Sequence, residues 1–208
     1  MTFEQVFPKV FKNEGGYANQ KNDTGGETYG GISRVYFPKW EGWALVDQFK
    51  KQNGGFLPRY WRNATLDAML PKFYKEEFWD KNHMDKFPPR LRLSLFDMAF
   101  NGGAGKAWGV LRMAAGMKYA TNFDTSLFEM AKKVMPEQYA AARIVRYEII
   151  VRDNPKNQEF LEGWKNRTAH ILKETKNWIL ANPGASGAMV LLLGIGIFVA
   201  VKAFARET

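Results

Sequence analysis

The sequence predicts a mainly α-helical fold, with a small β element near the N-terminus and one apolar helix at the C-terminus. Apolar residues recur at helical spacing along most of the 208-residue chain. Turn-forming Gly, Asn, Asp and Thr residues concentrate in residues 17–33, where they predict a short hairpin. An uncharged apolar run lies near the end of the chain. Together these observations predict one helical domain followed by a membrane-spanning segment.

The first predicted helix covers residues 3–11. Phe or Val occupies positions 3, 6, 7, 10 and 11, which places the apolar side chains on one helical face. Thr2 and Gln5 have the spacing of a capping box, whereas Pro8 predicts a late start or a kink. Two glycines at positions 15 and 16 end this helix and leave Glu14 in its last turn.

The rest of the chain is predicted to be helical apart from its loops. Residues 36–62 are rich in aromatic residues, Gly and Pro, and their pattern predicts no regular element. The predicted helices cover residues 64–79 with an interruption at Pro71, then 90–100, 106–117, 126–134, 137–152 and 157–176.

The C-terminal segment has the composition of a transmembrane helix. Residues 177–201 contain no charge, and residues 184–201 form an 18-residue apolar run. Trp178 before the run and Lys202 after it fit anchoring at the two interfaces. We therefore expect a domain over 1–176, a linker over 177–183, a transmembrane helix over 184–201 and a basic tail over 202–208. The alternative is a buried core helix.

Composition limits the classes of partner and cofactor. The net charge of +9 attracts polyanions such as nucleic acid, acidic membranes or the bacterial wall, but no nucleic-acid-binding motif is present, so no such partner is expected. The chain has no Cys and two separate histidines, so we expect no metal and no cofactor. Aromatic residues make up 15% of the chain, which fits either an aromatic core or a sugar-binding cleft.

Glu14, Asp23 and Thr28 form a candidate catalytic set. Hydrolysis of a glycosidic bond needs a proton donor for the leaving oxygen and a carboxylate that activates water. A Glu at a helix end can be half-buried, which raises its pKa into the range of a donor. Asp23 in a polar turn would stay ionised, and the Thr28 hydroxyl could hold the water. The alternative is a solvated Glu and a turn-forming Asp.

The motif around these residues resembles glycoside hydrolase family 108, whose members include bacterial and phage muramidases. The resemblance covers about residues 3–172. Its motifs are Glu14-Gly15-Gly16-Tyr17 with residues 22–28 and Gly31-Ile32, then residues 73–79, 96–103 and 160–167.

The resemblance implies a lysozyme-like fold, with peptidoglycan-binding-type helices at about residues 126–176 and peptidoglycan glycan strands as substrate. It assigns the catalytic acid to Glu14. The Glu, Asp, Thr order also resembles the triad of phage-type lysozymes, which points to Asp23 and Thr28. The same matches suggest Tyr17 as a substrate-binding residue.

Asn101 and Trp164 are also expected to bind substrate. Asn101 would bond an acetamido group, whereas Asp97 four residues earlier is expected to cap a helix or pair with an Arg in the core. Trp164 would stack on glycan with Arg167 beside it. In the alternative, Trp164 closes the core and Arg167 binds a helix end.

The expected reaction is cleavage of the β-1,4 bond between N-acetylmuramic acid and N-acetylglucosamine. One alternative is a lytic transglycosylase, in which the muramyl 6-hydroxyl replaces water. Another is a membrane-anchored virion protein that binds murein. Residues 1–11 lack the apolar core of a secretory signal, which together with the apolar C-terminus suggests a phage protein. Its expected location is a virion internal membrane or the host inner membrane, with other virion membrane proteins as partners.

Overall fold

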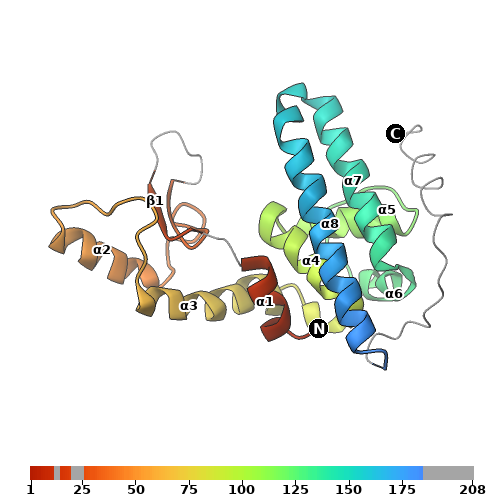
Figure 1. Ribbon diagram of the computed structural model, residues 1–208, viewed down its shortest axis with the longest axis horizontal. Coiled ribbons are helices and arrows are strands. Elements are labelled where there is room, and N and C mark those ends of the chain that lie inside the picture. Colours follow the sequence, from red (N-terminus) through yellow and green to blue (C-terminus); the bar gives the residue numbers. More distant parts are fainter. Residues whose placement is uncertain (12–14, 20–25, 185–208) are drawn as a thin grey trace. The chain divides into compact units, whose positions relative to one another are not determined.

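The computed structural model describes residues 1–11, 15–19 and 26–184 and divides the chain into two compact units. The sheet unit comprises Phe7–Glu77, and the helical unit comprises Met1–Val6 together with the chain from Phe78 onward. In Figure 1 the sheet unit contains β1, α2 and α3, and the helical unit contains the helices from α4 to α8.

A three-stranded antiparallel sheet occupies the part of the chain where the sequence predicted a hairpin. Its strands, in order, are β1 (Tyr17–Asn19), β2 (Glu27–Tyr29) and β3 (Ile32–Ser33). Gly30 and Gly31 form the turn between β2 and β3 with φ values of 52° and 81°, which favour glycine. A Cβ atom on Gly30 would also lie 2.7 Å from Leu70 Cδ1. The turn therefore packs directly against the helix that carries Leu70.

Two helices complete the sheet unit, α2 (Gly42–Gln52) and α3 (Ala64–Tyr74). The first lies within residues 36–62, for which the sequence predicted no element. Asn63 caps α3, because its side chain accepts hydrogen bonds from the backbone N–H groups of Thr65 and Leu66. The core of this unit is largely aromatic and aliphatic, with its most buried members at Tyr29, Ile32, Val46, Leu66 and Leu70.

The predicted interruption at Pro71 is wrong. Pro71 lies inside α3, which continues to Tyr74 and then passes into a π-helical turn at Lys75–Asp80, labelled η1. Leu70 and Phe73 on either side of the proline are buried, so side-chain packing offsets the lost backbone hydrogen bond.

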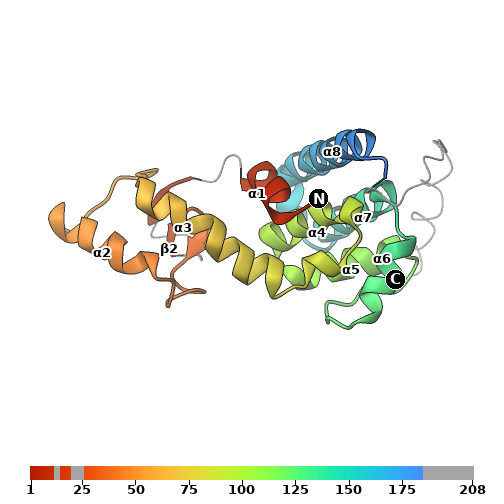
Figure 2. The same ribbon diagram turned by 90° about the horizontal axis from the view of Figure 1, so that it is seen from below.

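The helical unit is built around α4 (Pro89–Gly102), which follows the short 3-10 helix η2 (Met84–Lys86). Residues on every side of α4 are buried, including Leu91, Leu93 and Phe96, which is the pattern of a central helix. α4 packs against α5 (Ala104–Ala114), α7 (Pro136–Asp153) and α8 (Gln158–Ala181). Figures 1 and 2 both show α7 and α8 side by side, joined by the 3-10 helix η3 (Pro155–Asn157). α6 (Ser126–Lys133) packs on α5.

Helix α1 (Phe3–Phe11) begins directly after Thr2, so the late start suggested by Pro8 is wrong. The Gln5 side chain accepts a hydrogen bond from the Thr2 backbone N–H at 3.1 Å, which is one half of the predicted capping box. In the helical unit, Phe3 makes an edge-to-face contact with Trp79, with ring centroids 5.6 Å apart. The apolar face predicted for this helix is thus a packing face.

The fold class predicted from the sequence is wrong in its transmembrane helix. Among the described residues, no helix is both long and apolar enough to cross a membrane. α8 has 24 residues, which would suffice in length, but charged side chains such as Glu162, Lys165 and Lys173 interrupt it. Of the predicted segment 184–201, residues 185–201 lie outside the described residues. What the structure does show is a mainly helical chain with a small sheet.

Candidate active site

The first motif is described from Gly15 onward, and it is held by a backbone segment from the loop before α3. The Tyr17 N–H donates to Trp61 O at 2.8 Å, and the Tyr60 N–H donates to Tyr17 O at 2.7 Å. A Cβ atom on Gly16 would overlap the Trp61 carbonyl oxygen. The second glycine of the motif is therefore needed for this close approach. Glu14 itself lies outside the described residues.

Tyr60 stands beside the residue that follows Glu14. A Cβ atom on Gly15 would lie 3.3 Å from Tyr60 Cδ1, so the Tyr60 ring lies close to the motif backbone. This side chain is 61% exposed and its φ of 66° is unusual for a residue other than glycine. Such strain is often found where a side chain must be presented at a functional site.

Tyr17 ends in a charged network centred on Glu27. Its hydroxyl donates to Glu27 Oε1 at 2.8 Å, and burial followed by this hydrogen bond raises the pKa of Tyr17. Lys50 Nζ lies 2.8 Å from the same oxygen, and Arg34 Nε lies 3.0 Å from Glu27 Oε2. The Glu27 side chain is only 11% exposed. Glu27 on β2 thus bonds Tyr17 of β1 and Lys50 of α2, and it joins the sheet to that helix.

Thr28 lies on the opposite face of the sheet from Tyr17. In the register of the sheet Tyr17 pairs with Tyr29, whereas Thr28 pairs with Ala18 on one side and Ser33 on the other. Side chains alternate between faces along a strand, so Thr28 is separated from the Tyr17–Glu27 network. It is half-buried. Asp23, the other member of the predicted catalytic set, lies outside the described residues.

Asn101 belongs to the helical unit, where it bonds to Asp97. Asn101 Nδ2 donates to the Asp97 backbone oxygen at 2.7 Å and lies 3.4 Å from Asp97 Oδ1. Asp97 is fully buried and pairs with Arg143 Nη1 at 2.6 Å and with Arg167 Nη2 at 2.8 Å. The expectation that Asp97 pairs with a core Arg is confirmed. Arg167 binds the same carboxylate, whereas one sequence interpretation had placed Arg167 at a helix end. The 96–103 and 160–167 motifs therefore meet at one buried charge.

Trp164 is half-buried in an aromatic stack on the face formed by α7 and α8. Its ring centroid lies 4.9 Å from that of Tyr147 and 5.9 Å from that of Phe160. Phe160 is 49% exposed, so one end of the stack is open to solvent. The arrangement combines packing with an accessible aromatic face.

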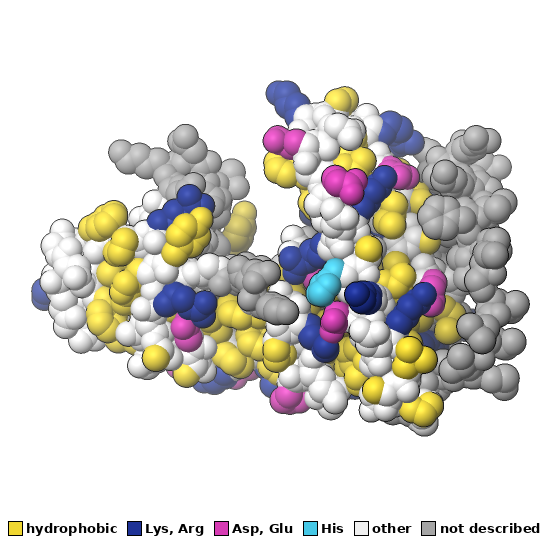
Figure 3. Space-filling model, in the orientation of Figure 1, with side chains coloured by type: hydrophobic (Ala, Val, Ile, Leu, Met, Phe, Trp, Pro, Cys, Tyr) yellow, Lys and Arg dark blue, Asp and Glu magenta, His cyan; other side chains and the backbone are white. Residues whose placement is uncertain are grey.

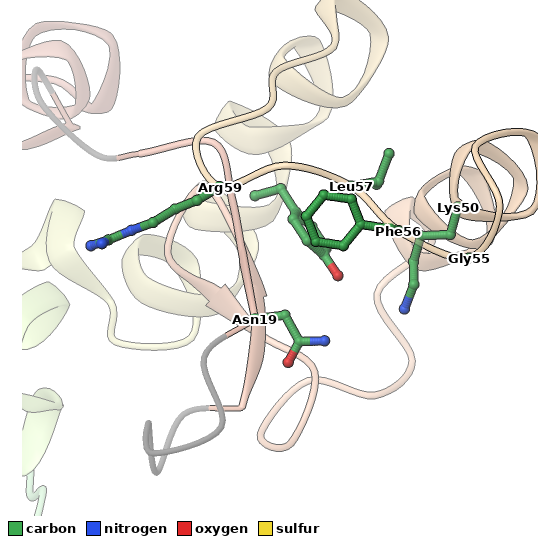
Figure 4. A pocket seen from close by; sticks show the side chains of 7 residues that line it. Asn19, Lys50, Gly55, Phe56, Leu57 and Arg59 are labelled. Carbon is green, nitrogen blue, oxygen red and sulfur yellow. The ribbon is translucent and has the colours of Figure 1, made fainter.

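A pocket of about 200 Å³ lies in the sheet unit beside Tyr17. Its lining comes from β1, from the end of α2 and from the loop that follows α2. Figure 4 shows the Phe56 ring in this loop, with the Asn19 and Lys50 side chains nearby. Within the described residues, no group of three His, Cys, Asp or Glu side chains is placed to hold a metal ion.

Sequence reasoning did not find Glu27, Lys50 or Arg34. Their contacts depend on the strand register and on α2. The sequence did not predict this helix, because it lies within the aromatic-rich residues 36–62. One signal was available. Pairing Tyr17 with Tyr29 in a hairpin would place Asn19 opposite Glu27 and on the Tyr17 face, as observed.

Comparison with known proteins agrees with the motif analysis. The model of the family described as glycosyl hydrolase 108 matches residues 7–103. Among solved structures, Brucella abortus SagA is similar with a TM-score of 0.57 and 20% identity over 84% of this chain and 94% of that chain. At this identity the similarity shows a shared fold. A search of curated proteins found no match. The family resemblance is thereby confirmed, and residues 7–103 belong to glycosyl hydrolase family 108.

Proposed function

We propose that the protein is a muramidase that cleaves the β-1,4 bond between N-acetylmuramic acid and N-acetylglucosamine in peptidoglycan. The observation that carries this proposal is the glycosyl hydrolase match over residues 7–103, because it contains the Glu14-Gly15-Gly16-Tyr17 motif. The proposed reaction uses side chains alone and requires no cofactor.

In the proposed reaction, Glu14 protonates the leaving oxygen of the glycosidic bond. Asp23 positions and activates water on the other face of the sugar, with the Thr28 hydroxyl as a further contact to that water. Glu14 and Asp23 lie outside the described residues, so their roles rest on the motif. The described part of the motif is held in place at Tyr17, whose N–H donates to Trp61 O and whose O accepts from the Tyr60 N–H.

Asn101 and Trp164 are proposed to bind the glycan. Asn101 uses its Nδ2 on Asp97, which leaves its Oδ1 to accept a hydrogen bond from an acetamido N–H. Trp164 and Phe160 offer a stacked aromatic surface with an exposed end, of the kind that packs on the apolar face of a sugar.

The net charge of +9 supports a polyanionic target. Figure 3 shows Lys and Arg side chains over both units on the face in view, with Asp and Glu among them. Attraction to the anionic cell wall would concentrate the enzyme on its substrate and would weaken as salt is added. A role in phage lysis or infection stays a prediction from the sequence.

Mass analysis of the products from purified sacculi tests the proposal. A muramidase releases fragments with a reducing N-acetylmuramic acid end. If Asp23 activates water the enzyme inverts the anomeric configuration, which NMR of the freshly formed end reports. Products ending in 1,6-anhydromuramic acid would instead identify a lytic transglycosylase. If correctly folded protein produced no new glycan end, it would be a binding protein, and this result would contradict the proposal.

A further inference from the structure

The pocket beside Tyr17 has an aromatic wall that does not belong to the core. Phe56 is 68% exposed and follows Gly54 and Gly55, whose φ values are 67° and 88°. The loop is nevertheless fixed, because the Gly55 N–H donates to Lys50 O at 2.7 Å. A single exposed Phe is ordinary on a protein surface, but this ring borders a concave site lined with polar groups.

A polar network centred on Glu27 reaches the pocket through Tyr17 and Lys50, which line it. The Tyr17 hydroxyl donates to Glu27, which in turn binds Lys50, and the Asn19 side chain also lines the pocket. Among the described residues Glu27 is the acceptor for the Lys50 ammonium, which leaves two of its N–H donors for a ligand. In Figure 4 the Asn19 and Lys50 side chains reach toward the space beside the Phe56 ring.

The charges of this network cancel. Arg34 pairs with Glu27 and with Asp47 at 2.8 Å, and Lys50 pairs with Glu27, so two cations face two carboxylates. Arg59 also lines the pocket, but Figure 4 shows its side chain extending away from Asn19 and Lys50. The site therefore suits a ligand that is polar and neutral.

We infer that this pocket binds one N-acetylhexosamine ring of the glycan strand, with Phe56 stacked on the apolar face of the sugar. Asn19 and Lys50 would bond its hydroxyl or acetamido groups. The volume of about 200 Å³ is below the roughly 300 Å³ at which pockets for drug-sized ligands begin, which fits a single ring. The inference rests on the proposed function, because it adds a sugar subsite to the same enzyme.

Calorimetric titration with triacetylchitotriose tests this inference on the full chain. The Glu14→Gln variant serves as the background, since it removes the proposed acid and keeps the probe intact. We expect Phe56→Ala in this background to raise the Kd about three- to tenfold, the usual range for one aromatic contact. Tyr36→Ala is the matched control, because Tyr36 is 69% exposed and does not line the pocket. It should leave the Kd within about twofold.

Three results would overturn the sugar subsite: no binding of the probe by the background variant, an unchanged Kd in Phe56→Ala, or an equal loss in Tyr36→Ala. The inference that the ligand is bound through neutral contacts is tested separately, by measuring the Kd at several salt concentrations. Because triacetylchitotriose is uncharged, its Kd should not change with added salt, whereas a steep increase in Kd would contradict binding through the polar, neutral contacts inferred here. Wall-degrading activity that still requires Glu14 would show that failure of this inference leaves the proposed function intact.

Discussion

Tyr29 joins the sheet to α3 through one hydroxyl group. The ring is fully buried, and its hydroxyl accepts from the Asn63 N–H at 2.9 Å and donates to Asp67 Oδ1 at 2.8 Å. Asn63 is also the residue that caps α3. A single polar atom therefore connects strand β2 to the start of the helix that follows the Tyr60 loop.

Tyr29→Phe keeps the ring and removes these hydrogen bonds. We expect it to lower the free energy of unfolding by about 1–3 kcal/mol, because a buried N–H and a carboxylate lose their partner. Urea unfolding of both proteins at neutral pH measures the change. Tyr36→Phe, at a 69% exposed position, should differ from wild type by less than about 0.5 kcal/mol.

The Tyr29 hydroxyl also predicts that the folded state loses stability at high pH. Burial raises the pKa of Tyr29 from 10.0 to about 12. The pKa of Tyr29 is higher in the folded state than in the unfolded state. The stability that its neutral hydroxyl contributes is therefore complete below pH 10 and is lost as the pH rises through about 12. The stability difference between wild type and Tyr29→Phe should therefore narrow over this pH range. A difference that stays constant up to pH 12 would contradict the assignment.

At the scale of elements, the loop before α3 acts as a backbone partner of β1. This contact requires Gly16, which has no room for a side chain beside Trp61. The sequence identified the glycine as a helix stop and as part of a family motif. It could not show the close contact, because the partner segment lies more than forty residues later and has no periodic pattern.

Gly16→Ala should displace this loop from β1. We expect a loss of more than about 2 kcal/mol in unfolding free energy, the range for overpacking and backbone strain. Gly163→Ala is the matched control. Gly163 lies inside α8 with nothing within 4 Å of a Cβ atom, so alanine should be neutral or stabilising by up to about 1 kcal/mol. Similar losses in both variants would refute the argument from the Trp61 contact.

Asp97 connects three helices, because it lies on α4 and pairs with Arg143 of α7 and Arg167 of α8. The sequence predicted that Asp97 caps a helix or pairs with an Arg in the core, but it could not select the Arg. The chain contains many arginines, and the choice is made by how α7 and α8 pack on α4.

Asp97→Asn leaves Arg143, which is 1% exposed, without a carboxylate. We expect the free energy of unfolding to fall by about 3–5 kcal/mol, the cost of breaking a buried pair. Asp153→Asn removes a surface partner of Arg152 and should cost less than about 1 kcal/mol. Thermal or urea unfolding compares the two. A small effect at Asp97 would mean that water or another group satisfies Arg143.

At the scale of the whole molecule, helical periodicity identified the long helices, and α4 to α8 lie within a few residues of their predicted ranges. The division into two units was not predicted, because its boundaries fall inside α1 and η1, where the sequence shows no break. The transmembrane helix was inferred from composition alone, and no described helix has that character. The family was recognised from the order of the motifs, because four weak motifs in the expected order are more specific than any one of them.

The family match spans 7–103, so it includes the Glu14 motif of the sheet unit and the Asn101 motif of the helical unit. The matched region therefore includes elements of both units. The central claim is that Glu14 supplies the proton for cleavage of the glycan.

The rate at which Glu14→Gln releases soluble fragments from purified sacculi tests that claim most directly. Glutamine preserves the shape of the side chain but cannot donate the proton, so the rate should fall by roughly two to four decades, with unfolding curves unchanged. Glu159→Gln, an exposed position on α8, should retain the wild-type rate. A Glu14→Gln protein that clears sacculi at near wild-type rate would contradict the account.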